Sequence, residues 1–264
     1  MAAKIYRPNN LKMNNITIIN KAVFKWGSTC LVLGLLFTSC KKDEVISPEP
    51  EKEIPTKTEG GTPYYKLQRI ENLAVETDDA NPTVPPTAVL FSLETKEIVP
   101  LLYAKTNRWD VGFNGLYNSF LSPNSGQSST SLGSGSTGLG AITILEKPFD
   151  QVVDVPADAA LSISKFIGTD NEGDFGEGIG WYLYDFGGTK RGDGSYDKQH
   201  VAYAMPEKRT LIIRTAKGDY AKIKMISCYK DAFTADKWFR TTPHMYFTFE
   251  YVIVPKGSTK FEIK

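Results

Sequence analysis

The sequence of 264 residues predicts an all-β protein built on a single antiparallel β domain. Residues 244–254, "HMYFTFEYVIV", alternate between two faces, which is the side-chain period of a strand. Residues 209–230, "RTLIIRTAKGDYAKIKMISCYK", form two strand-like runs around the turn "AKG", in which Gly218 can adopt a positive φ. The 14 Phe, 13 Tyr and 4 Trp residues also suit strands and binding surfaces.

Shorter β elements precede this hairpin, beginning near residue 64. Residues 64–76 carry apolar side chains without a helical face, and residues 88–101 hold two apolar runs split by "ETKE", as in a hairpin. Residues 107–115, "NRWDVGFNG", place aromatic and apolar side chains at alternating positions, as in a strand. Residues 156–166 and 231–239 are candidates for short helices. Helices are therefore expected to be minor within one antiparallel domain.

A Ser/Gly-rich segment, "SPNSGQSSTSLGSGSTGLG" at residues 122–140, interrupts the predicted strands. Its composition predicts a loop that is too polar to pack, and loops of this length are usually functional or disordered. No Gly-Lys-Ser/Thr triplet follows its glycines, so the segment does not match a phosphate-binding loop.

The N-terminal segment has the pattern of a secretory leader. Lys21 and Lys25 precede an apolar run of roughly 14 residues, which is shorter than the about 20 that a membrane-spanning helix needs. The small residues Thr38 and Ser39 are followed directly by Cys40, which resembles the site where a bacterial lipoprotein is cleaved and acylated. The structural alternative for Cys40 is a buried cysteine at the end of a helix.

Three segments follow from this interpretation. Residues 1–39 form the expected signal peptide, with Met13 as an alternative start of translation. Residues 40–63 hold the lipidated Cys40 and a tether rich in Pro, Glu, Lys and Gly, whose lack of apolar periodicity predicts disorder. Residues 64–264 form the expected β domain. The "KKDE" after Cys40 resembles a surface-export signal, so we expect a protein anchored by lipid in the outer membrane and displayed at the cell surface.

Charge and residue usage argue against several functional classes. The 31 Lys and Arg residues nearly balance the 30 Asp and Glu residues, so there is no overall basic field to attract nucleic acid. Two histidines and three cysteines do not provide the close pairs of ligands that structural zinc sites use. The sequence has no Gly-x-Ser-x-Gly motif and no Cys–His pair with a visible orienting partner. We therefore expect a binding protein, not an enzyme.

The order of several segments resembles the HmuY family of surface lipoproteins. "RWDVGFNG" precedes the Ser/Gly-rich loop, and "FDQVVDVP", "GWYLYDF", the hairpin at 209–230 and "YFTFEYV" follow it. The sharpest pieces are "WDV.F" and "RTAKGDYAKIKM.S.Y", and the similarity covers residues 64–256. The resemblance implies an almost entirely β fold shaped like a hand, with haem held between loops at one end.

The resemblance also implies that the protein binds haem or a related porphyrin and passes it to an outer-membrane receptor. Haem usually takes axial ligands from His, Met, Cys or Tyr. In residues 196–209, "YDKQHVAYAMPEKR", His200 Nε2 or the Met205 sulfur is the candidate ligand. Residues 118–199 contain no His, Met or Cys, so the family's second ligand is not visible. Four tyrosines near this region are weaker candidate donors: Tyr117, Tyr182, Tyr184 and Tyr196.

The missing second ligand leaves an alternative function open. The chain is then a surface binding, scaffold or adhesin lipoprotein of the same fold that takes no haem. Trp109 and Trp181 are interpreted as sheet core, and Cys228, His244 and Met245 as structural residues of the strands.

Overall fold

The structure, a computed structural model, describes residues 62–264. The expected signal peptide, Cys40 and nearly all of the expected tether lie outside these residues. The described part of the chain contains eleven strands. They are β1 (Gln68–Ala74), β2 (Val89–Ser92), β3 (Glu97–Val99), β4 (Val111–Asn114), β5 (Phe120–Pro123), β6 (Ala141–Leu145), β7 (Tyr182–Asp185), β8 (Val201–Ala204), β9 (Thr210–Arg214), β10 (Tyr220–Tyr229) and β11 (His244–Val254).

Helical structure in residues 62–264 is confined to single 3₁₀ turns. The short helices predicted at residues 156–166 and 231–239 are present only as η4 (Asp158–Ala160) and η6 (Ala235–Lys237). In this part of the chain, no helix has the length and hydrophobicity that a membrane crossing requires. The remaining turns are η1 (Leu101–Tyr103), η2 (Leu116–Asn118), η3 (Phe149–Gln151) and η5 (Tyr196–Lys198).

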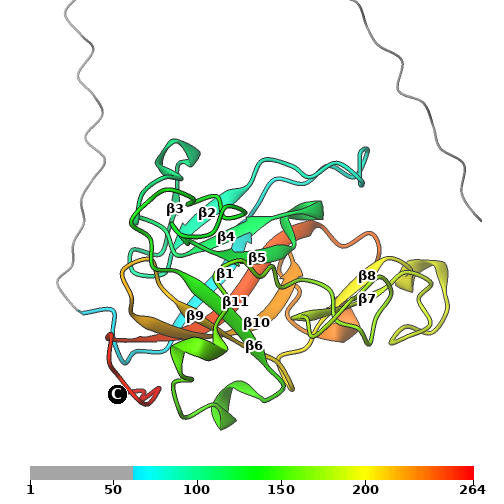
Figure 1. The fold of residues 1–264 in the computed structure, drawn as a ribbon. Coiled ribbons are helices and arrows are strands. Elements are labelled where there is room, and N and C mark those ends of the chain that lie inside the picture. Colours follow the sequence, from blue (N-terminus) through cyan, green and yellow to red (C-terminus); the bar gives the residue numbers. More distant parts are fainter. Residues whose placement is uncertain (1–61) are drawn as a thin grey trace, which may run out of the picture. The chain divides into compact units, whose positions relative to one another are not determined.

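The strands form three sheets in which every pairing is antiparallel (Figure 1). The largest has the order β1-β11-β10-β9-β6, the second β3-β2-β4-β5, and the third is the β7-β8 hairpin. The all-β prediction is confirmed, as are the β2–β3 hairpin and the β9–β10 hairpin with Gly218 at a φ of 97°.

Aromatic side chains from the two larger sheets meet in one core. The rings of Phe113 on β4 and Phe247 on β11 lie 4.6 Å apart, and those of Phe91 and Phe249 lie 5.7 Å apart. All four side chains are buried. Removing the apolar surface of each from water contributes about 1.5–3 kcal/mol to stability. Trp109 and Trp181 are also buried, which confirms their interpretation as core residues.

The Ser/Gly-rich segment at residues 122–140 is packed, so the prediction that it is too polar to pack is wrong. Asn124 is completely buried, and its Nδ2 donates to the carbonyl oxygens of Thr106 and Trp109, at 2.8 Å each. Gly140 packs so tightly on this residue that an added Cβ would lie 2.3 Å from the Asn124 carbonyl oxygen. Polar side chains therefore bond to buried backbone carbonyl groups, and the glycines, which have no side chain, let segments of the loop approach each other closely.

Candidate functional site

The β7–β8 hairpin carries the segment that the sequence singled out. Tyr184 on β7 pairs with Ala202 on β8, and residues 186–200 connect the two strands. In Figure 1 the hairpin and its loops, drawn in yellow, lie to one side of the two larger sheets. Tyr184 and Ala202 are only partly buried and pack against the main core.

Four ring-bearing residues gather at this hairpin, and we call Phe175, Tyr184, Phe186 and His200 the aromatic cluster. The ring centroids of Phe186 and His200 lie 4.7 Å apart, and those of Phe175 and Phe186 lie 5.5 Å apart. Phe175 is 74% exposed and Phe186 is 48% exposed. Adjacent exposed phenylalanines are uncommon on a soluble domain, and such patches mark surfaces that bind an apolar partner.

His200 is held by contacts on its backbone and on one ring nitrogen. Its N–H donates to the Phe186 carbonyl oxygen at 3.2 Å, and its Nδ1 lies 2.8 Å from the Tyr184 hydroxyl. Among the described residues, its Nε2 has no hydrogen-bond partner. Partial burial and the nearby Arg240 charge lower the pKa of His200, which favours a neutral imidazole with a lone pair.

Two members of the aromatic cluster have a left-handed backbone. His200 has a φ of 59° and Phe175 a φ of 61°, in a region that bulky side chains seldom occupy. Residues held in this conformation cost about 1–3 kcal/mol and tend to occur where function requires a particular side-chain direction.

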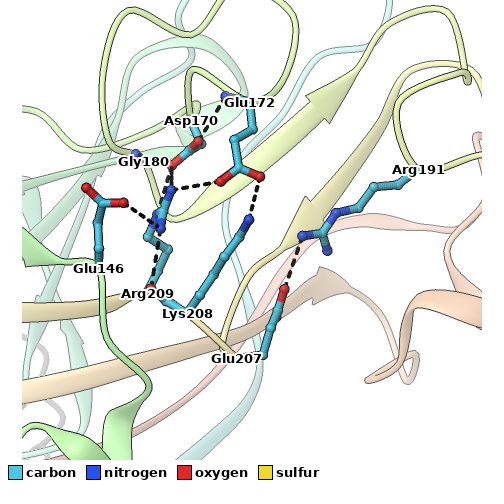
Figure 2. A network of polar contacts seen from close by, with 8 residues as sticks. All are labelled: Glu146, Asp170, Glu172, Gly180, Arg191, Glu207, Lys208 and Arg209. Atoms are coloured by element: carbon cyan, nitrogen blue, oxygen red, sulfur yellow. Dashed lines mark hydrogen bonds and ion pairs between the residues drawn. The ribbon is translucent and has the colours of Figure 1, made fainter.

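A buried ion pair fixes the loop that carries Phe175 (Figure 2). Arg209 and Asp170 are both buried, with Nη2 and Oδ2 2.8 Å apart, and Arg209 also reaches Glu172 at 3.2 Å. Asp170 accepts backbone hydrogen bonds from Glu172 and Gly180 at 3.0 Å each. Burial alone raises the pKa of the Asp170 carboxyl, but these donors together hold it below its usual value. The loop therefore has a defined shape.

The connection from β7 to β8 is organised by one carboxylate. Asp185 is completely buried and accepts hydrogen bonds from four successive backbone N–H groups, residues 189–192, at 2.8–3.0 Å. Burial raises the pKa of Asp185, and these four donors outweigh that effect and lower it. The segment leading toward His200 is therefore anchored at its start.

The structure separates the sequence-predicted ligands into two groups. His200 and Tyr196 lie at the surface, and the Arg240 guanidinium stacks 4.7 Å from the Tyr196 ring. Met205 is 0% exposed and belongs to the main core, so its sulfur does not reach the surface that carries His200. Tyr182 is buried as well, with its hydroxyl 3.0 Å from Ser119 Oγ, and burial raises its pKa.

Sequence reasoning missed most of the aromatic cluster. It named Tyr184 only as one of several tyrosines, and it did not single out Phe175 or Phe186. The alternation in "WYLYDF" was the available signal, because it places Tyr182 and Tyr184 on one face of a strand. That pattern does not show that Tyr182 is buried while Tyr184, on the same face, is only partly buried and contacts His200.

A shallow cleft of about 510 Å³ lies near the cluster but is lined by different residues. Tyr203 contributes to it, and because side chains alternate along β8, Tyr203 points away from the face of Ala202 and Tyr184. The two basic side chains that line the cleft already have partners. Arg191 pairs with Glu207 at 3.1 Å, and Lys198 donates to the Trp238 carbonyl oxygen at 2.8 Å. The aromatic cluster is therefore the better candidate site.

Comparison with known families identifies the domain. The family model described as HmuY protein matches residues 86–251, which is more than half of the chain. The match includes β2 to β10 and the whole aromatic cluster. No curated protein matches the chain. The all-β fold and this match together show that the chain belongs to the HmuY family.

Proposed function

We propose that the chain is a lipid-anchored surface protein that captures haem or a related porphyrin and passes it to an outer-membrane receptor. The observation that carries this proposal is the exposed His200 imidazole, with its Nδ1 held by Tyr184, among exposed aromatic rings in a domain of the HmuY family, a family associated with haem binding. The mechanism is binding and release of cargo, without turnover.

The residues of the aromatic cluster fit a planar, apolar, metal-bearing ligand. Phe175 and Phe186 expose ring surface that a macrocycle would cover, which removes apolar area from water at about 25 cal/mol per Å². His200 Nε2 would contact the metal, since imidazole nitrogen is a common axial ligand of haem. Arg240 has no carboxylate partner among the described residues, and its charge suits the carboxylates of a porphyrin.

The other candidate donors contribute differently to this proposal. Met205 can reach a ligand only if the core around it opens, because its side chain has no exposed surface. The same holds for Tyr182, whose side chain is also buried. Tyr196 is 64% exposed and lies beside Arg240, so it can border the ligand without rearrangement. Binding through His200 as a single strong ligand is therefore the form of the proposal that the geometry favours.

The location in this proposal depends on the leader and on Cys40, which lie outside the described residues. An acylated Cys40 would hold the domain at the outer membrane, where captured haem meets a receptor. HmuY family proteins are surface-associated, which agrees with this placement.

A second function is a surface scaffold or adhesin of the same fold that takes no haem. The burial of Met205 favours it, because the structure then offers one surface histidine where better-known members of the family use two ligands. The exposed phenylalanines would in that case contact a protein partner.

Haem titration of residues 41–264, which contain every described strand, separates the two functions. We expect a shifted Soret band in the wild type and its loss or weakening in His200→Ala. His244→Gln is the matched control, because it removes the other histidine at a different position, the start of β11. Met205→Leu keeps the core volume and removes the sulfur, so it tests that ligand without opening a cavity. An unchanged free-haem spectrum in the wild type would favour the scaffold.

A further inference from the structure

We propose that Tyr184 is the positioning residue for His200: its hydroxyl holds Nδ1 of the imidazole, so that Nε2 points toward the ligand. This inference rests on the proposed function, in which His200 is the donor to the metal. It assigns a specific task to a tyrosine whose ring also belongs to the apolar surface of the site.

The first support is the contact itself. The Tyr184 hydroxyl and His200 Nδ1 are 2.8 Å apart, and the two rings meet edge-on with centroids 6.2 Å apart. The imidazole also packs edge-on against Phe186, with ring centroids 4.7 Å apart. The ring is thus held by one hydrogen bond and two aromatic neighbours, while Nε2 is left without a partner among the described residues.

The second support is that the backbone of Tyr184 is restrained by several contacts. Its backbone pairs with Ala202 across the hairpin, and its carbonyl oxygen accepts from the Asp174 N–H at 2.8 Å. Gly173 packs so closely that an added Cβ would lie 2.6 Å from the Tyr184 backbone nitrogen. A hydroxyl carried by so constrained a strand can hold an imidazole that sits on a left-handed backbone.

Proton placement explains why the contact matters. A metal at Nε2 needs the lone pair of that nitrogen, so the single proton of the neutral imidazole must lie on Nδ1. The Nδ1–H then donates to the Tyr184 oxygen, which a neutral phenol can accept while keeping its own O–H. Ligating histidines almost always donate their second N–H in this way, and removing such a partner typically costs 10–100-fold in metal affinity.

The test begins with the protein free of haem. The sequence has two histidines, so the imidazole NMR signals of His200 and His244 are readily assigned. We expect Tyr184→Phe, which keeps the aromatic ring, to release the His200 ring and reduce the order of its Cε1–H bond. Tyr220→Phe is the matched control, because it removes a tyrosine hydroxyl that donates to Asp158 at 2.7 Å at the start of β10, outside the aromatic cluster, and it should leave the signal unchanged.

The second readout is haem binding by residues 41–264. We expect Tyr184→Phe to raise the Kd for ferric haem about tenfold and to raise the midpoint potential, because an unanchored imidazole donates less electron density to ferric iron. Tyr220→Phe should change neither value. His200→Ala should remove the axial signature altogether, since the donor atom is gone.

Each outcome decides the inference. It is overturned if Tyr184→Phe leaves either the order of the His200 ring or the haem affinity unchanged. It is also overturned if His200→Ala keeps the axial signature and Tyr184→Phe loses it, because Tyr184 would then be the donor. Failure of the wild type to bind haem rejects the proposed function instead, and the imidazole signal still decides whether Tyr184 holds His200.

Discussion

At the scale of single residues, one buried carboxylate joins the two larger sheets. Asp110 precedes β4, and its Oδ2 accepts from the Leu93 N–H at 2.9 Å while its Oδ1 accepts from the Ala216 N–H at 3.0 Å. Leu93 follows β2, whereas Ala216 lies in the turn between β9 and β10. Burial raises the pKa of Asp110 to about 6, although both hydrogen bonds oppose the rise.

This raised pKa predicts how stability depends on pH. Because the folded pKa lies above the unfolded one, the folded state binds more protons between about pH 4 and 6, and the free energy of unfolding falls as pH rises through that window. A shift of about 2 units corresponds to about 3 kcal/mol. Asp110→Asn lacks this titration. The free energy of unfolding of the variant minus that of the wild type should therefore rise as the pH is increased from 4 to 7. Urea unfolding of both proteins at several pH values measures the difference, and parallel curves would contradict the prediction.

Single residues also show what alternation along a strand leaves undetermined. Alternation along β10 puts Lys222 on the face opposite Ala221 and Ile223, and yet Lys222 is buried too. Its Nζ donates to the carbonyl oxygens of Phe149 and Val152 at 2.9 Å each. These acceptors come from a distant part of the chain. A period of two identifies the faces of a strand but does not show what covers each face.

At the scale of elements, the β7–β8 hairpin depends on charges in the loops beside it. The Arg209–Asp170 pair joins the segment before β9 to the loop that carries Phe175 (Figure 2). Arg209 is 5% exposed and Asp170 is 0% exposed. Removing one partner of a buried pair leaves the other charge unpaired in an environment that solvates it poorly.

Arg209→Met is therefore expected to destabilise the domain by about 3 kcal/mol or more, and to speed amide exchange in residues 170–180. Arg191→Met is the matched control, since the exposed Arg191–Glu207 pair should contribute less than about 1 kcal/mol. Denaturant unfolding and hydrogen–deuterium exchange measure the two effects. Equal stability losses in the two variants would contradict the structural role of the buried pair.

The elements also show where sequence patterns succeed. The β9–β10 hairpin and β11 were predictable because local alternation and one turn glycine define them. The packing of the Ser/Gly-rich loop was not, because it depends on Asn124 reaching Thr106 and Trp109. At the site, too, local sequence indicates a segment but not its tertiary contacts. The sequence indicated the segment with His200, but the pairing of His200 with Tyr184 arises only when β7 and β8 come together.

At the scale of the whole molecule, the charge balance bears on how the protein would reach a membrane. The formal net charge is +1, with 31 basic and 30 acidic residues, so electrostatic attraction to anionic lipid is weak. Stable anchoring by lipidation needs more than one acyl chain, or one chain with a basic patch. The proposed location therefore depends on the diacylation of Cys40.

Replacing Cys40 by Ser should accordingly prevent acylation and, because Cys40 is also the predicted cleavage site, leave residues 1–39 attached. When cells are labelled with a tagged fatty acid, the wild type should incorporate the label and Cys40→Ser should not. Cys30→Ser is the matched control, because Cys30 lies in the segment that cleavage removes, and it should behave as wild type. Mass spectrometry of the wild type should find acyl chains on an N-terminal cysteine. A wild type that carries no lipid, or a Cys40→Ser variant that still incorporates fatty acid, would contradict anchoring through Cys40.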